Sequence, residues 1–163
     1  MSLLSWAPLA IAAGLIAAAA AFDIARRKIP NWVVIALVAT WIVAVIANLS
    51  PTGLTSGAAA AGIGLAATFG LYWFGILGAG DAKLFAAVAL FMGLTHLAAF
   101  AVLTAIAGGL LAILFFLMSP KKVLRGLTKQ GRAENKGGGI PYGVAIALGA
   151  IATFALSPEL HAV

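Results

Sequence analysis

The stretch Gly78-Ala79-Gly80-Asp81-Ala82-Lys83 places a carboxylate and an ammonium group inside a chain that is otherwise almost entirely apolar. The 163 residues include four acids, and two of these, Asp23 and Asp81, lie at the ends of long apolar runs. An ionisable side chain at membrane depth costs about 2.5–3.5 kcal/mol on insertion, so it usually serves a function. We therefore interpret the rest of the chain as a frame that brings Asp23 and Asp81 together.

The composition is that of a polytopic, all-α membrane protein. Hydrophobic residues make up 64% of the chain, charged residues make up 9%, and the mean hydropathy is +1.14. Soluble domains of this length are far more polar. The absence of cysteine excludes disulfides, thiolate catalysis and cysteine metal sites. We expect one transmembrane domain over residues 1–163, with an uncleaved first helix, because no basic residue precedes the first apolar run.

The apolar pattern predicts six transmembrane helices, separated by proline and glycine signals. The predicted spans cover residues 3–22, 32–49, 56–77, 81–93, 97–118 and 140–156. The fourth span is short, at about 20 Å against a hydrocarbon core of roughly 30 Å. Either the bilayer thins there or the Gly-Ala-Gly break lies below the membrane surface. Both arrangements predict a recessed polar pocket at Asp81.

The net charge of +6 reflects membrane topology rather than nucleic-acid binding. With six spans and the N-terminus outside, all ten Lys and Arg residues fall on the cytoplasmic side. They occupy residues 26–28, Lys83 and a basic loop over residues 119–139, which can contact anionic lipid. The same topology puts Asp23 and Asp81 at one membrane face and both termini outside.

Two carboxylates in one cavity can share a proton, because like charge and partial desolvation oppose double ionisation. The ionised member can then deprotonate a water while the protonated member polarises a peptide carbonyl. The alternative is that each acid only neutralises a nearby cation. Asp23 would then pair with Arg26 or Arg27, and Asp81 with Lys83.

Three motifs resemble those of the type IV prepilin peptidases, which are Gly-x-Gly-Asp intramembrane aspartyl proteases. The first is the Gly78–Lys83 stretch, and the second is Asp23 followed by Ile29-Pro30-Asn31. The third is Pro141-Tyr142-Gly143 at the start of the last span. The three occur in the family's order and together cover nearly the whole chain.

The resemblance implies an aspartic endopeptidase of the bacterial inner membrane that removes the basic leader of prepilins or pseudopilins at the cytoplasmic face. Asp23 and Asp81 would be the catalytic pair, supported by Gly78, Gly80, Lys83, Pro30 and Asn31. A substrate-docking role for Pro141, Tyr142 and Gly143 rests on the resemblance alone. The chain resembles the short form associated with tight-adherence (Flp-type) pili, without the N-terminal region linked to methyltransferase activity. No cofactor and no metal are expected, because His96 and His161 lie away from the acids.

A small transporter or channel is the alternative from another class, because glycine-broken helices and membrane acids also build ion sites. Transporters of that kind often contain internal repeats, and none is apparent here. A non-catalytic assembly scaffold would need neither acid. Lys83 follows Asp81 by two positions and so does not face it on a helix; its ammonium is expected to extend toward the lipid headgroups.

Overall fold

The computed structural model describes residues 3–118 and 141–157, and all the secondary structure in these residues is helical. The helices are α1 (Leu3–Arg26), α2 (Asn31–Ile46), α3 (Leu54–Trp73), α4 (Ala79–Met118) and α7 (Tyr142–Leu156). The prediction of an all-α protein is therefore confirmed. The predicted loop over residues 119–139 and His161 lie outside the described residues.

The structure does not bear out six separate spans. Among the described residues, three helices are long and apolar enough to cross a membrane: α1, α3 and α4. Helices α2 and α7 are apolar but shorter. The predicted fourth and fifth spans correspond to two helical segments of α4, residues 79–92 and 94–118, which are separated by a break at a single residue, Gly93, instead of by the expected turn over residues 93–96.

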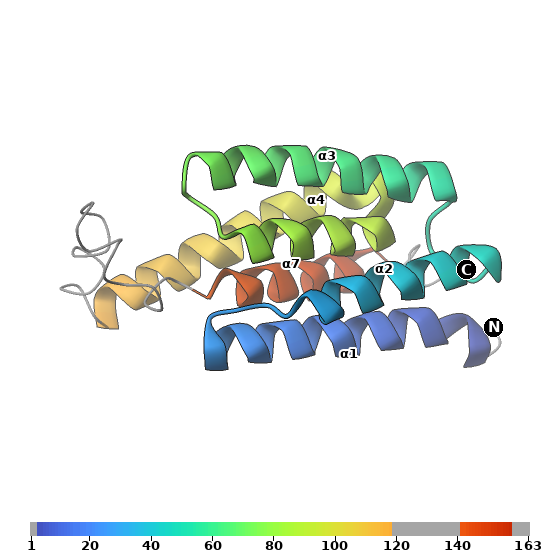
Figure 1. Cartoon of the computed structure of the whole chain (residues 1–163), viewed down its shortest axis with the longest axis horizontal. Helices are drawn as coiled ribbons and strands as arrows, with labels where there is room; N and C mark the ends of the chain where they lie inside the picture. The colour runs from blue at the N-terminus through green and yellow to red at the C-terminus, as the bar shows by residue number, and fades with distance from the viewer. Residues whose placement is uncertain (1–2, 119–140, 158–163) are drawn as a thin grey trace.

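Helix α4 folds back on itself at Gly93. We call residues 79–92 its first arm and residues 94–118 its second arm. The rings of Phe85 and Phe100 stack with their centroids 4.5 Å apart, whereas 15 residues of straight helix would span about 22 Å. Figure 1 shows the chain running away from residue 79 and then returning toward Met118. Gly93 has φ 62° and ψ −179°, a conformation that only glycine adopts readily.

The reversal is held by side chains from α2, from the connection between α2 and α3, and from the first turn of α3. In a continuous helix, the N–H of Leu94 would donate to the carbonyl of Leu90. Here the Thr52 hydroxyl donates to the Leu90 carbonyl at 2.7 Å, and the Leu94 N–H donates to the Ser56 hydroxyl at 3.0 Å. The Trp41 indole N–H donates in turn to the Thr52 hydroxyl at 3.1 Å. We call Trp41, Thr52 and Ser56 the hydroxyl clamp.

Helices α2 and α3 end in the same way, through a residue in the left-handed conformation. After α3, Gly75 has φ 69°, and the N–H groups of Gly75 and Ile76 donate to the carbonyls of Tyr72 and Leu71. After α2, Asn48 has φ 55° and makes the equivalent hydrogen bond to Val45. These Schellman motifs satisfy carbonyls that a helix end leaves unpaired.

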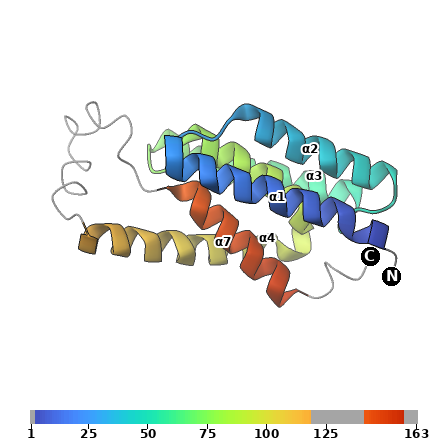
Figure 2. The same ribbon diagram turned by 90° about the horizontal axis from the view of Figure 1, so that it is seen from below.

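The first arm of α4 forms the centre of the molecule. Every residue from Leu84 to Gly93 is buried. Helix α3 packs along one side of α4, and α7 crosses the second arm obliquely with α1 beside it (Figure 2). Large apolar side chains are exposed on the outer faces of the helices, including Ile35, Phe69 and Leu110. An apolar exterior around a small-residue core suits a lipid environment.

One end of the bundle collects the polar sequence motifs. The ends of α1 and α3, the starts of α2, α4 and α7, and the end of the second arm all lie there (Figure 1). The start of α1, the end of α7 and the reversal at Gly93 lie at the opposite end. Chain segments that are far apart in sequence therefore meet at the end that carries Asp23 and Asp81.

Candidate active site

Asp23 lies in the last turn of α1 and is buried, with 7% of its surface exposed. Its Oδ2 accepts a hydrogen bond of 2.8 Å from the backbone N–H of Gly143, which is 120 residues away in sequence. Gly143 lies in the first turn of α7, where unpaired N–H groups and the helix dipole favour a negative charge. The start of α7 therefore binds the Asp23 carboxylate.

Only glycine fits at position 143. A Cβ there would lie 2.9 Å from Oδ2 of Asp23 and 3.1 Å from its Cβ. Pro141 precedes the helix with φ −71° and is buried; its carbonyl accepts a hydrogen bond from the Val144 N–H. Proline suits this position because its fixed φ favours a helix start.

Asp81 lies in the first turn of α4 and is partly buried. Its Oδ2 accepts a hydrogen bond of 3.3 Å from the backbone N–H of Gly78, the residue just before the helix. This hydrogen bond is one half of a capping box, in which the acidic side chain at the third helical position accepts from the backbone N–H of the N-cap residue. A Cβ on Gly78 would lie 2.7 Å from the same oxygen, so the glycine makes room for the carboxylate.

The end of α1 and the start of α4, which carry Asp23 and Asp81, lie at the same end of the bundle (Figure 1), and the charge of Asp23 acts on Asp81. Ile29, in the connection after α1, packs beside Gly80, where an added Cβ would lie 3.6 Å from the Ile29 Cβ. Each carboxylate thus accepts a hydrogen bond from a glycine N–H. Asp23 accepts it from Gly143 at the start of α7, and Asp81 accepts it from Gly78 just before α4.

The cations near Asp23 are held by aromatic rings. The Arg26 guanidinium lies 5.6 Å from the Phe22 ring centroid, and that of Arg27 lies 5.4 Å from the Phe115 ring centroid. Arg27 also attracts the Asp23 carboxylate electrostatically. The predicted alternative, in which Asp23 lies near a cation, therefore describes part of its environment. The hydrogen bond to its carboxylate, however, comes from the backbone N–H of Gly143.

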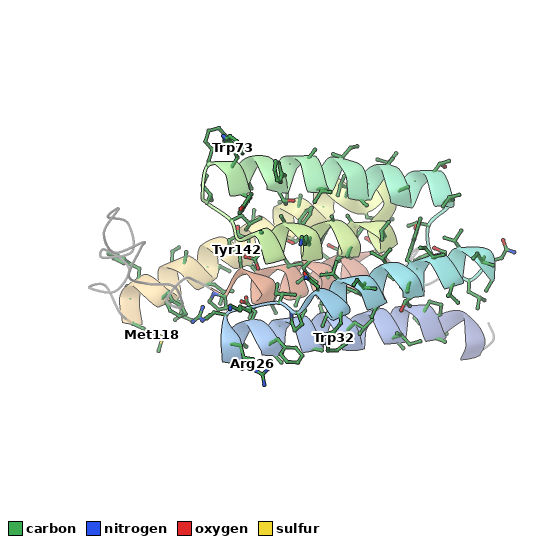
Figure 3. The ribbon with its side chains drawn as sticks, viewed as in Figure 1. Arg26, Trp32, Trp73, Met118 and Tyr142 are labelled. Atoms are coloured by element: carbon green, nitrogen blue, oxygen red, sulfur yellow. The ribbon has the colours of Figure 1, made fainter. Side chains whose placement is uncertain are left out.

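The remaining residues of the predicted motifs surround this pair. Pro30 caps α2 with φ −65° and ψ 137°, and Asn31 is the first residue of that helix and is exposed. Lys83 is also exposed, as its two-residue offset from Asp81 predicts. Tyr142 is partly buried and lies at the same end of the bundle as Arg26 and Met118 (Figure 3).

The structure contains an apolar cavity of about 440 Å³. It lies between α3, both arms of α4 and α7, and its lining includes Leu77, Phe85, Thr104 and Tyr142. Phe85 follows Asp81 by four residues, so the two lie on one face of the first arm. The cavity is therefore lined by residues that flank Asp81 in sequence, Leu77 and Phe85, while neither aspartate belongs to its lining.

Two contributions to the site were not predicted from the sequence. Gly143 was expected only as a docking residue, yet its N–H holds Asp23. Gly108, which the sequence analysis does not single out, makes room for the Tyr142 ring. A glycine pair at positions 108–109 is the only signal in the sequence, and it does not identify the partner. Within the described residues, no group of three or more His, Cys, Asp or Glu side chains could hold a metal ion.

Comparison with protein families decides what kind of protein carries this site. Residues 9–113 match the model of the type IV leader peptidase family. The chain belongs to the type IV leader peptidase family. It is accordingly a peptidase, and its apolar helices make it a membrane protein. No curated protein and no solved structure matches it.

The match to the leader peptidase family includes both aspartates and the clamp at the opposite end, and it stops before α7. The N–H that holds Asp23 therefore comes from outside the matched region. The catalytic role of the aspartates stays a prediction, and the family membership favours a peptidase over the transporter alternative.

Proposed function

We propose that this leader peptidase is an aspartic endopeptidase of the bacterial inner membrane that removes the basic leader of prepilin or pseudopilin substrates. The observation that carries the proposal is that Asp23, in the last turn of α1, and Asp81, in the first turn of α4, lie at the same end of the bundle, where the charge of one acts on the other. Each carboxylate is anchored through one oxygen to a glycine N–H. Such anchoring fixes the carboxylates, and fixed geometry is what proton transfer to and from a substrate requires.

The chemistry follows from one proton shared by two acids. The ionised carboxylate takes a proton from water, and the water oxygen attacks the carbonyl carbon of the scissile bond. The protonated carboxyl group donates its proton to the carbonyl oxygen, giving a neutral tetrahedral intermediate. When the C–N bond breaks, the leaving amine receives the proton taken from water, and the hydroxyl proton returns to the second carboxylate. No covalent intermediate with the enzyme forms.

The aspartate end is proposed to face the cytoplasm. Arg26, Arg27, Lys28 and Lys83 all lie at the ends of helices beside the acids. The remaining six Lys and Arg residues belong to the segment that joins α4 to α7. Helix α4 ends and helix α7 begins at this end of the bundle (Figure 1). A cluster of cations at one face indicates the cytoplasmic side of a membrane protein.

The proposal is tested by co-expression with a Flp-type prepilin and measurement of the pilin mass. The wild-type chain is expected to remove the leader. Asp23→Asn and Asp81→Asn are each expected to lower cleavage by at least about a hundredfold, because a carboxamide cannot act as a base or share the proton. Glu134→Gln, the same acid-to-amide change at a position outside the described residues, should leave cleavage intact. Normal processing by both aspartate variants would exclude an aspartic mechanism.

Orientation is tested separately by thiol labelling, which the cysteine-free sequence allows without prior mutation. Gly53→Cys lies at the end opposite the acids, where an added Cβ meets no neighbour. Lys28→Cys lies at an exposed position beside Asp23. A membrane-impermeant reagent should label Gly53→Cys in spheroplasts and Lys28→Cys only after lysis. The opposite pattern would reverse the proposed orientation.

A further inference from the structure

The connection between α3 and α4 carries three large apolar side chains that face outward. The exposed fractions of Trp73, Phe74 and Ile76 are 77%, 75% and 68%. We call these three residues the apolar turn. Figure 3 shows Trp73 at the end of the bundle that also carries Arg26 and Met118. A group of large apolar side chains left open in this way marks a contact surface.

The geometry of the chain at this point does not require such large side chains. Phe74 is the C-cap of α3 and Ala47 is the C-cap of α2, and both helices end in the same Schellman motif. The methyl group of Ala47 is therefore sufficient at the position that Phe74 occupies. The indole and phenyl rings of Trp73 and Phe74 thus serve a purpose other than ending the helix.

The apolar turn is fixed on both sides. The Schellman motif ties it to α3. Leu77, the next residue, is buried, and the N–H of Gly78 donates to the Asp81 carboxylate at 3.3 Å. Asp81 follows the last residue of the turn by only five positions. Whatever surface contacts the turn therefore also determines where Asp81 lies.

A lipid bilayer is the contact that the surroundings of the turn favour. The turn continues the outer face of α3, where Phe69 is also exposed, and this apolar exterior is that of a membrane protein. The sequence contains no charged residue between Lys28 and Asp81. At the same end of the bundle, the exposed side chains of Arg26 and Lys28 suit anionic headgroups. Tryptophan is enriched where headgroups meet acyl chains.

We propose that the apolar turn inserts into the boundary between the headgroups and the acyl chains of the bilayer, and that this contact fixes the depth of Asp81. Trp73, Phe74 and Ile76 form the anchor, and the short, tied segment from Leu77 to Gly80 transmits its position to the acid. The inference requires that the chain is a membrane protein, and it does not depend on the proposed peptidase reaction.

Spin labelling tests the depth of the turn, because the chain has no cysteine of its own. The full chain with Phe74→Cys is labelled with a nitroxide and placed in vesicles of phosphatidylcholine and phosphatidylglycerol. Oxygen, which partitions into lipid, should relax the label more than a water-soluble nickel chelate does, at a depth of about 5–10 Å. Lys28→Cys, exposed at the same end, is the control and should respond more to the nickel chelate. The same response from Phe74→Cys would overturn the proposal, because a turn that binds a protein partner would lie in water.

A second label tests whether the turn fixes the depth of Asp81. It is placed at Ala79→Cys, which is exposed and lies two positions before the acid. Replacing Trp73 and Phe74 together by Ser should raise its accessibility to the nickel chelate at least about twofold, because no aromatic ring then holds the turn at the boundary. Ile46→Ser, which changes a side chain of 76% exposure at the end of α2, is the matched control and should leave this accessibility unchanged. Unchanged accessibility in the double Ser variant would overturn the anchoring role.

Discussion

The two ends of the first arm of α4 use the same structural device for different purposes. At each end, a glycine borders the helical arm, and side chains hydrogen-bond to backbone groups there. At Gly93 these side chains come from distant segments, and at Gly78 the side chain is that of Asp81, three residues away. At Gly93 the groups are neutral hydroxyls, and they pair the Leu90 carbonyl and the Leu94 N–H. At Gly78–Asp81 the side chain is a carboxylate, and a second carboxylate stands nearby. Neutral, paired groups stabilise a fold, whereas neighbouring charges raise its energy and allow proton chemistry.

Gly93→Ala is expected to have the largest effect, and to act on stability. A Cβ at this residue would strain a backbone with φ 62° and would lie 2.8 Å from Thr52 Cγ2. We expect a loss of about 3 kcal/mol in the free energy of unfolding, seen as a lower melting temperature in detergent. Gly62→Ala is the control, because an added Cβ there meets no neighbour. A wild-type melting temperature in Gly93→Ala would show that the reversal is not strained.

Gly143→Ala should damage the opposite end in a different way. The new methyl group would displace the Asp23 carboxylate from its N–H, so we expect about a hundredfold loss of kcat from misplaced geometry. The melting temperature should fall by far less than in Gly93→Ala. Gly14→Ala, in the same helix as Asp23 and without close neighbours, should keep wild-type kcat. A Gly143→Ala variant that melts early and retains its kcat would erase the distinction between the two ends.

Thr52→Val should weaken the hydroxyl clamp without affecting the chemistry. It removes one bond to the Leu90 carbonyl and one from the Trp41 indole, so a loss of about 1–3 kcal/mol is expected. Chemical denaturation of the solubilised protein measures this loss, while kcat of the folded protein should stay unchanged. Trp41→Phe should be less costly in the Thr52→Val background than in the wild type. Strict additivity would mean that the Trp41–Thr52 hydrogen bond contributes nothing.

Lys83→Gln should have the smallest effect, although it lies in the same motif as Asp81. Its side chain is exposed and sits two positions from the acid, so it does not face Asp81. We expect kcat to stay within about twofold of the wild type, because an exposed charge pair contributes little. A tenfold loss of kcat would show that Lys83 contributes to the site, and would contradict the expectation that exposed residues of the motif matter less than buried ones.

The sequence predicted the local features of this structure well. The helical class, the restart of the helix at Pro30 and Asn31, and the placement of Asp81 in a first helical turn all follow from apolar runs and glycine or proline signals. Lys83 is exposed, and the expectation that it does not face Asp81, which follows from helix geometry, stays a prediction. The single-domain organisation stays a prediction.

Contacts between distant segments could not be predicted in this way. The expected turn over residues 93–96 is a break at one residue. It can be this short because the Thr52 hydroxyl donates to the Leu90 carbonyl and the Ser56 hydroxyl accepts from the Leu94 N–H. Nothing local to Gly93 reveals those partners. The hydrogen bond from Gly143 to Asp23 likewise joins residues 120 positions apart, and a glycine in an apolar helix start is most simply explained by packing.

Burial of the first arm over residues 84–93 has a mechanical consequence. This buried part of the arm is about 15 Å long at 1.5 Å per residue, and the hydrogen bonds at Gly93 anchor its far end. Sliding or rotating it to bring Asp81 toward a substrate would require the whole interior to repack. We therefore expect Asp81 to be the stationary partner of the pair. Any closure on a substrate would then come from α1, which carries Asp23, and α7, which carries the Gly143 N–H that binds it.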